Sequence, residues 1–413
     1  MPALAPFGIR SFRYQWPADL ATSWAFEMET LILGWYVLVE TRSVTLLALF
    51  ASLQYTGTFV GPLMGVAGDR IGHRKLLCAM RGAYTLFSST LMVLTLTGVV
   101  SPMAVFIVAG LNGLVRPSDI GVRAAVVGDI MPAAQLMAAM GIQRTTQDSA
   151  RIVGALSGAG LVAALGMGVA YAVVALLYAT SFVLTWRAGG AHKAVAHVAQ
   201  APRVRASPWR ELVEGLVYAW NTPLLLALLC LAFLLNFTAF PLLNGLQPYV
   251  AKEIYHGDQR LLGYMIAASS FGALIGSLMM SRSRSALPAA RVVIVFSLAW
   301  YVAMFVYSRM TVPVTGIAVL LFAGFAQSFS QVPMAAILLR NVEPDYRGRV
   351  MGIRMMMING NIPGLLISGP LIASYGYSIT SALYCAVGIC CTLLIVLRWR
   401  AHLWRWTAPA NRF

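Results

Sequence analysis

Charged residues are scarce in this sequence: Asp, Glu, Lys and Arg make up only 11% of the 413 positions, whereas 59% are hydrophobic. No class of soluble globular protein combines these two values, so the composition favours a protein embedded in lipid. Acidic residues are fewer than basic ones, with 14 against 30. This excess of positive charge does not indicate nucleic-acid binding, because the arginines lie in short loops between apolar segments and not on one basic face. We therefore expect no nucleic-acid partner.

Cysteine and histidine are also few, with five of each. The cysteines all fall in or at apolar segments, and they form neither a disulfide framework nor a metal-spaced pair of pairs. The histidines lie outside those segments, so a buried haem or zinc site has no obvious ligands. The HExxH and GxSxG motifs and a phosphate-cradling loop are absent too. We predict no enzyme activity, no metal and no cofactor, which disfavours an intramembrane hydrolase or an ATP-driven pump.

Long apolar runs, by contrast, recur along the whole sequence. Each is about 20 residues or more, which at about 1.5 Å of helical rise per residue covers the roughly 30 Å of a bilayer's hydrocarbon core. Twelve such segments lie at residues 18–40, 44–67, 76–99, 102–127, 143–166, 168–188, 222–246, 260–281, 290–309, 312–338, 350–373 and 377–398. The sequence therefore predicts an all-α integral membrane protein with twelve transmembrane helices.

The charges of the loops predict the orientation of these helices. Of the 30 Lys and Arg residues, four lie deep within the expected spans, and 22 lie on one side, in tails and loops or near the ends of spans. Only Arg42, Lys252, Arg260 and Arg309 lie on the opposite side. Because loops rich in Lys and Arg stay in the cytoplasm, we expect a multi-pass protein with both termini cytoplasmic.

The two halves of the sequence repeat each other at an offset of about 210 residues. The matching small residues are Gly141, Ser157, Gly158 and Gly166 in the first half and Gly352, Ser368, Gly369 and Gly376 in the second. The pair Gly57 and Gly61 is likewise echoed by Gly272 and Gly276. Such a repeat predicts two parallel six-helix bundles related by an axis along the membrane normal. We expect an N-terminal bundle over residues 1–188, a cytoplasmic linker over 189–221 and a C-terminal bundle over 222–413.

A charged loop with small residues joins the second and third segments. Its glycines let helices approach closely, and its basic residues keep the loop on the cytoplasmic side of the membrane. The residues that define it are Gly65, Asp69, Arg70, Gly72 and Arg74, followed by Lys75. They resemble the signature of the major facilitator superfamily, except that His73 stands where an arginine is usual. The resemblance covers essentially the whole chain, and it implies the major facilitator fold and the secondary transport of a small molecule.

Within that superfamily the chain is most similar to the bacterial enterobactin-exporter-like and macrolide-efflux-like group. The matching pieces are residues 33–35, 214–215, 343–344 and 347–352. The resemblance implies antiport from the bacterial inner membrane, and a gate in which Asp69 docks against span eleven and Arg74 meets Asp129. Two patterns of the superfamily are missing: Ala109 takes the arginine position in span four, and the glycines of span five lack their proline. Export by antiport therefore follows from resemblance alone.

Eight charged residues deep in the expected spans are candidates for binding a proton or a substrate, and none of them lies in the second half. Each costs about 2.5 to 3.5 kcal/mol when it faces lipid at mid-membrane, so most must face protein or water. They are Glu27 and Glu29 in span one, Arg116, Asp119 and Arg123 in span four, and Arg144, Asp148 and Arg151 in span five. Each trio lies along one helix face, so the two stripes could face each other or line one cavity wall.

Two interpretations of these charges remain open. In the first, the trios form a fixed ion-pair network that locks spans four and five together. In the second, Asp119 or Asp148 exchanges a proton while Arg116, Arg123 or Arg151 contacts an anionic substrate or the empty carboxylate. Glu27 and Glu29 lie about 200° apart around a helix, so we expect one to face the cavity and the other a helix contact. At least one of them is expected to carry a proton.

Neutral polar residues in the second half are further candidates for the substrate cavity. Asn236, Gln327 and Asn359 could donate or accept hydrogen bonds to substrate, although bonds between helices explain any single one more simply. We expect a proton-linked secondary transporter that acts as a monomer and exports an amphipathic small molecule, such as a drug or siderophore. The alternatives are a transporter of lysophospholipid or another lipid, an importer of a small molecule, and a non-transporting sensor of the same fold.

Overall fold

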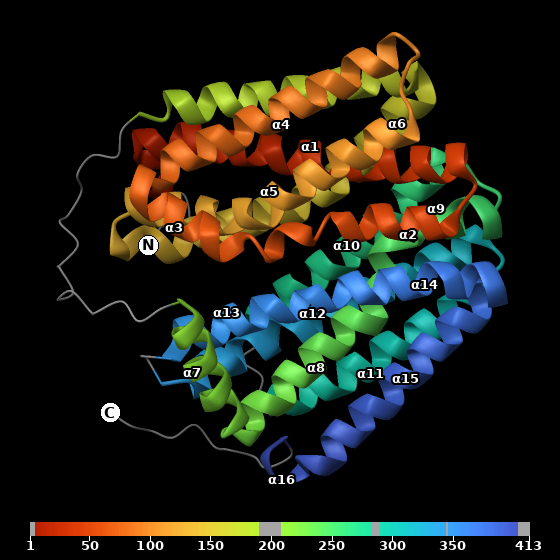
Figure 1. Cartoon of the computed structure of the whole chain (residues 1–413). Coiled ribbons are helices and arrows are strands. Elements are labelled where there is room, and N and C mark those ends of the chain that lie inside the picture. The colour runs from red at the N-terminus through yellow and green to blue at the C-terminus, as the bar shows by residue number, and fades with distance from the viewer. Residues whose placement is uncertain (1–4, 190–207, 283–288, 344–345, 404–413) are drawn as a thin grey trace. The chain divides into compact units, whose positions relative to one another are not determined.

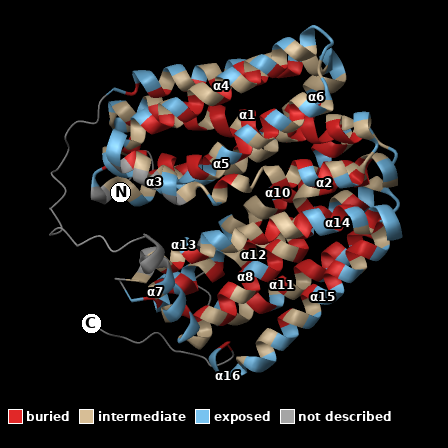
Figure 2. Ribbon diagram, viewed as in Figure 1, coloured by how far each residue is buried: buried red, intermediate tan, exposed pale blue. Residues whose placement is uncertain are grey.

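The computed structural model describes residues 5–189, 208–282, 289–343 and 346–403, together with most of their side chains. Within these ranges the chain is helical and contains no strand. Nine of the described helices are long and apolar enough to cross a membrane (Figure 1). Large apolar side chains remain exposed along them, as expected for surfaces that face lipid. Figure 2 shows exposed positions along the helices in pale blue.

The twelve expected spans are all found among the described helices. The long helix α6 (Ala133–Arg187) contains two of them, which meet at Gly166, where φ is 80° and the backbone is left-handed. The first span is α1 (Arg10–Thr41), which carries more charge than an ordinary membrane helix. The second is broken into α2 (Val44–Leu53), η2 (Thr56–Thr58) and α3 (Gly61–Ile71). The predicted twelve-helix membrane fold is thereby confirmed.

By its contacts the chain divides into two compact units: Met1–Arg205 with Pro248–Ala267, and Ala206–Gln247 with Ala268–Phe413. The expected bundles over residues 1–188 and 222–413 remain a prediction. Much of the expected linker over 189–221 lies outside the described residues, although the short helix α7 (Pro208–Trp220) lies within them.

The first unit contains α1 to α6, with α4 (His73–Leu96) and α5 (Pro102–Ile130) as its third and fourth spans. Helix α1 packs most extensively along α6. Two glycines of α6 allow this close approach, because a Cβ added at Gly154 would lie 2.7 Å from the Cβ of Glu27, and one at Gly158 would lie 3.1 Å from the Cα of Met28. The small residues of span five therefore bring the acidic side of α1 against α6.

The second unit is built from the remaining helices. These are α7, α8 (Pro223–Phe240), η3 (Pro241–Gly245), the later part of α10 (Gln259–Arg282), α11 (Ala289–Tyr307), α12 (Pro313–Asn341), α13 (Arg347–Met357), η6 (Ile358–Gly360), α14 (Asn361–Tyr375), α15 (Tyr377–Arg398) and α16 (Arg400–Leu403). The short α9 (Gln247–Tyr249) and η4 (Val250–Ile254) join η3 to α10. Helices α11 and α12 form the most extensive pair in this unit.

Glycines bring matching spans together in each unit. In the first, any Cβ at Gly57 would overlap the carbonyl oxygens of Gly113 and Leu114, and one at Gly113 would overlap the carbonyl of Leu53. In the second, Gly272 and Gly324 meet the backbone of the facing helix in the same way, at Leu321 and Ser269. Spans two and four, and spans eight and ten, thus pack backbone to backbone, which explains the repeated glycines of the sequence.

Replacing Gly113 with alanine is expected to destabilise the protein by about 1 to 3 kcal/mol, because its Cβ would collide with backbone that cannot move aside. The thermal midpoint of the purified protein in detergent measures this effect. Gly110 lies on the same helix with nothing within 4 Å of an added Cβ. Gly110→Ala should be neutral or slightly stabilising through helix propensity, and equal loss in both variants would contradict the packing account.

Candidate functional site

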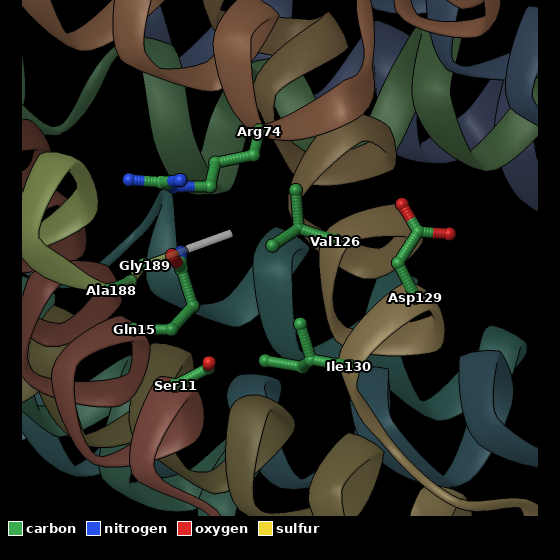
Figure 3. A pocket seen from close by; sticks show the side chains of 8 residues that line it. All are labelled: Ser11, Gln15, Arg74, Val126, Asp129, Ile130, Ala188 and Gly189. Atoms are coloured by element: carbon green, nitrogen blue, oxygen red, sulfur yellow. The ribbon is translucent and has the colours of Figure 1, made fainter. Parts of the chain in front are cut away.

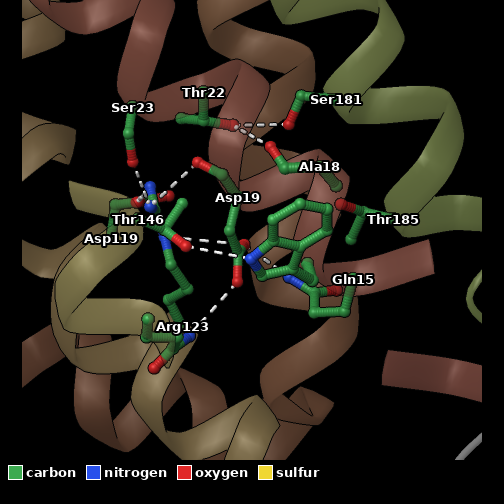
Figure 4. A network of polar contacts seen from close by, with 12 residues as sticks. Gln15, Ala18, Asp19, Thr22, Ser23, Asp119, Arg123, Thr146, Ser181 and Thr185 are labelled. Carbon is green, nitrogen blue, oxygen red and sulfur yellow. Dashed lines mark hydrogen bonds and ion pairs between the residues drawn. The ribbon is translucent and has the colours of Figure 1, made fainter. Parts of the chain in front are cut away.

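The first unit contains a buried group of four charges, which we call the Asp19 cluster: Asp19, Arg81, Asp119 and Arg123. Figure 4 labels Asp19, Asp119 and Arg123 of this cluster. Each of the four side chains is at most 3% exposed. Arg81 forms an ion pair with Asp19, and Arg123 forms one with Asp119. Arg123 Nε also lies 3.6 Å from Asp19 Oδ1, so the two pairs form one network with no net charge.

Neutral side chains complete the hydrogen bonding of the Asp19 cluster. Gln15 Nε2 donates to Asp19 Oδ1 at 2.7 Å, and Gln143 Nε2 donates to Asp19 Oδ2 at 3.1 Å. Arg123 donates to Ser23 Oγ at 2.8 Å, and Arg81 donates to Thr185. Because the partners come from α1, α4, α5 and α6, the cluster ties four helices of this unit together.

A second buried centre surrounds Glu29, whose side chain accepts hydrogen bonds from three neutral groups. Tyr171 donates to Oε1 at 2.9 Å, Tyr178 donates to Oε2 at 2.8 Å, and Asn112 Nδ2 donates to Oε1 at 3.1 Å. Glu29 is 4% exposed and both tyrosines are fully buried. We call these four residues the Glu29 cage. Among the described residues, those bonded directly to this carboxyl group are all neutral.

The break in span two lies beside this cage. Between α2 and α3 the hydroxyls of Thr56 and Thr58 donate to the carbonyls of Leu53 and Tyr55, at 2.9 and 2.7 Å, in place of a continuous helix. Irregular backbone at membrane depth is tolerated only where protein or a water-filled cavity covers it. Here it is packed on α5 through Gly57 and Gly113.

Arg116 is oriented by the same break. Its guanidinium donates to Gln54 Oε1 at 2.6 Å and to Thr30 Oγ1 at 2.7 Å, and it lies 4.4 Å from the ring centroid of Phe26. These partners are neutral, and they hold the cation within electrostatic reach of Glu29 without a direct ion pair. Arg116 thus supplies positive charge near the cage.

The remaining in-span charges form looser pairs. Glu27 Oε2 lies 3.9 Å from Arg151 Nε, with side chains 24% and 37% exposed. Asp148 pairs with Arg144 at 3.2 Å along the same helix, and the Arg144 side chain is 70% exposed. In the described contacts Arg123 of α5 and Arg151 of α6 each reach an acidic residue of α1. The partners are Asp19 for Arg123 and Glu27 for Arg151, so α1 lies against both α5 and α6.

Glu27 and Glu29 point in different directions, Glu27 toward Arg151 and Glu29 into its cage. Asp119 and Arg123 pair within α5, and Arg123 also contacts α1, so the choice between a fixed ion-pair network and proton exchange remains a prediction. A role as proton carrier remains a prediction for each of Glu27, Glu29, Asp119 and Asp148.

The signature loop connects α3 to α4 through Gly72, whose φ of 92° is accessible mainly to glycine. Arg70 is exposed, whereas the burial of Gly65 and of the Asp69 side chain lies outside what the structure describes. His73 Nδ1 lies 2.8 Å from Asp129 Oδ2, so the histidine that replaces the usual arginine itself contacts Asp129. Arg74 donates instead to the carbonyls of Thr185, at 3.1 Å, and Trp186. Arg74 and Asp129 line a small pocket of about 40 Å³ (Figure 3), and their expected contact in another state remains a prediction.

The candidates of the second unit lie in a neutral setting. Asn361 Nδ2 donates to Asn236 Oδ1 at 3.0 Å, and Asn236 donates to the carbonyl of Ala232 at 2.8 Å. Asn236 therefore serves a contact between α8 and α14. Gln327 on α12 and Asn359 in η6 are half-buried. Their part in a substrate cavity remains a prediction.

Sequence reasoning missed several residues of these two centres. The charge pattern groups Arg81 with the cytoplasmic loop charges and indicates no role for Asp19, although Asp19 lies at the start of the expected first span and Arg81 lies within the third. Their position within apolar runs was the available signal. Tyr171 and Tyr178 gave no signal of their own, because tyrosine is common in membrane helices and their spacing of seven residues fits any helix face.

Comparison with known proteins places this geometry in a family. A family model described as transmembrane secretion effector matches residues 1–412. No curated protein matches the chain. Among solved structures, it is similar to the nucleoside transporter NupG, with a TM-score of 0.72 and 14% identity over 96% of this chain and 99% of that one. It is also similar to an auto-inhibited POT family peptide transporter, with a TM-score of 0.73 and 12% identity over 98% and 99%.

A D-xylose–proton symporter is a further structural relative, with a TM-score of 0.67 and 12% identity over 93% of this chain and 97% of that chain. At these identities the solved structures establish the fold alone. The family match establishes more, since it indicates a multi-pass membrane transporter of small molecules and not an enzyme. The chain belongs to the transmembrane secretion effector family, within the major facilitator superfamily.

Proposed function

We propose that the protein is a proton-linked secondary transporter that exports an amphipathic small molecule by alternating access. In this proposal it works as a monomer in the bacterial inner membrane, with both termini in the cytoplasm. The resemblance to the enterobactin and macrolide exporters supports the direction and the class of cargo. The buried carboxyl of Glu29 supports the proton.

The observation that carries the proposal is the composition of the Glu29 cage. Three neutral donors satisfy the carboxylate when it is ionised. The same groups can accept a protonated carboxyl, because a tyrosine oxygen or the amide oxygen of Asn112 can take the added hydrogen. The Oδ1 atom of Asn112 is buried and has no hydrogen-bond partner among the described residues. The cage therefore suits a group that changes its protonation state during the cycle.

The other in-span acids fit this role less well. Asp119 pairs with the buried Arg123, so protonation of Asp119 would leave Asp19 as the acidic partner of Arg123 among the described residues. Asp148 and Glu27 already have arginine partners on partly exposed surfaces. Arg116 supports Glu29 from a distance and balances its charge in the empty carrier. Asp119, Asp148 and Glu27 are then charge partners and not the principal proton carriers.

A proton gradient across proteoliposomes should drive transport of an amphipathic probe. Fluorescent probes such as rhodamine 6G should accumulate in vesicles with an acidic lumen, and the accumulation should collapse when nigericin dissipates the gradient. Vesicles without protein provide the baseline. Probe movement that ignores the gradient would remove proton coupling from the proposal.

The same vesicles separate the alternatives of cargo and direction. A fluorescent lysophosphatidylethanolamine moved between leaflets, with soluble probes left untouched, would favour a lipid transporter. Accumulation of the probe on the alkaline side, in the direction in which protons flow, would favour an importer. Both outcomes would overturn export of a soluble amphiphile.

A further inference from the structure

The short helix α7 has two unlike faces. One face is fixed to α13: Glu214 Oε2 lies 3.0 Å from Arg349 Nη1, and the rings of Tyr218 and Tyr346 stack with centroids 4.3 Å apart and planes 7° apart. Gly215 packs so closely that an added Cβ would lie 2.8 Å from the Cβ of Arg349. These contacts lie within the second unit and hold α7 in a defined orientation on the start of span eleven.

The other face of α7 is an exposed apolar stripe. Val213, Leu216, Val217 and Trp220 are 40%, 47%, 53% and 69% exposed. They recur at i, i+3, i+4 and i+7, which places them in one row along the helix. Four large apolar side chains in a row on a helix that does not itself span the membrane require a partner, because such a surface is unfavourable in water.

The position of α7 in the chain identifies that partner. Only Asn221 and Thr222 separate Trp220 from α8, a membrane-spanning helix that begins at Pro223. The face opposite the stripe packs on the first turns of another span. Helix α7 therefore lies at the depth where spans end, and a tryptophan at its end is typical of the boundary between headgroups and acyl chains.

We propose that α7 lies in the membrane–water interface of the second unit, with the stripe of Val213, Leu216, Val217 and Trp220 inserted among lipid acyl chains. The occupant of this surface is the bilayer itself. Because α7 is fixed to α13, its depth in the interface is coupled to the position of span eleven. Lipid packing at this surface would then act on a span that moves during transport.

Site-directed spin labelling in lipid nanodiscs tests this placement. A label at Val217→Cys, in a chain whose five native cysteines are replaced, reports contact with lipid through relaxation by oxygen and contact with water through a soluble nickel chelate. The matched control is Glu343→Cys, because Glu343 is exposed and its backbone N–H donates to Tyr218 of the same helix. We expect the ratio of oxygen to nickel accessibility to be several-fold higher at position 217 than at position 343.

Two results would overturn the proposal. Equal accessibility to the nickel chelate at both positions would mean that the stripe faces water. Protection of position 217 from both reagents would mean that protein covers it, from another part of the chain or from a second copy. Double electron–electron resonance on the singly labelled protein separates these cases, since only a second copy gives a distance between labels.

Discussion

Replacing Asp19 with asparagine is expected to destabilise the first unit by about 3 to 5 kcal/mol, the cost of leaving a buried charge without its partner. Asparagine keeps the shape of the side chain but removes the charge that faces Arg81, which is fully buried. Arg81 would then retain Thr185 as its remaining bonded partner of the network. The free energy of reversible unfolding in mixed detergent micelles measures the loss.

A double variant separates charge from shape in this prediction. Asp19→Asn with Arg81→Met removes one charge of each sign, so the Asp19 cluster remains neutral and most of the stability should return. Arg144→Met provides the surface control, because its pair with Asp148 is exposed and should change stability by no more than about 1 kcal/mol. Equal losses of unfolding free energy for Asp19→Asn and Arg144→Met would show that burial of the Asp19 cluster does not increase the cost of removing a charge.

Replacing Glu29 with glutamine is expected to abolish the dependence of transport on the proton gradient. The glutamine is nearly isosteric and neutral, so it mimics the protonated carboxyl and cannot release a proton. Gradient-driven uptake of the probe should fall by about tenfold or more, each factor of ten corresponding to about 1.4 kcal/mol of lost coupling. Initial rates in proteoliposomes, with and without an imposed gradient, measure the effect.

Two further variants make this result specific to the cage. Glu27 lies two residues from Glu29 and pairs with Arg151. The variant Glu27→Gln should therefore lower transport less than Glu29→Gln does, and transport should still depend on the proton gradient. Tyr178→Phe removes one donor to Glu29 and should give an intermediate effect with a shifted pH profile. If Glu27→Gln removes the gradient dependence and Glu29→Gln retains it, the two acids have been assigned the wrong way round.

The fold could be predicted from the sequence because its signals are long and redundant. Twelve apolar runs, the charge bias of the loops and the repeated glycines each indicate the same architecture. Even the joint of the long helix α6 lies at Gly166, which is the last residue of the predicted fifth span over 143–166. The break in span two was not predicted, because Gly57 was interpreted only as part of the repeat between the two halves.

The candidate site could be predicted only in part, since its contacts join residues far apart in sequence. Asp19 and Gln143 are 124 positions apart, and Glu29 and Tyr171 are 142 apart. Helical spacing identified the charged stripes of α5 and α6, but it could not identify α1 as the partner of both. Tertiary packing decides such pairings. The replacement of an arginine by His73 was visible in the sequence, yet its contact with Asp129 was not.

Infrared difference spectroscopy of the protein in lipid tests most directly whether Glu29 exchanges a proton. We predict a carboxylic C=O band that appears and disappears with pH, shifts when the transported probe is added, is absent from Glu29→Gln and persists in Glu27→Gln. The same band in Glu29→Gln, or a Glu29 carboxyl that keeps one protonation state at every pH and with or without probe, would contradict this account.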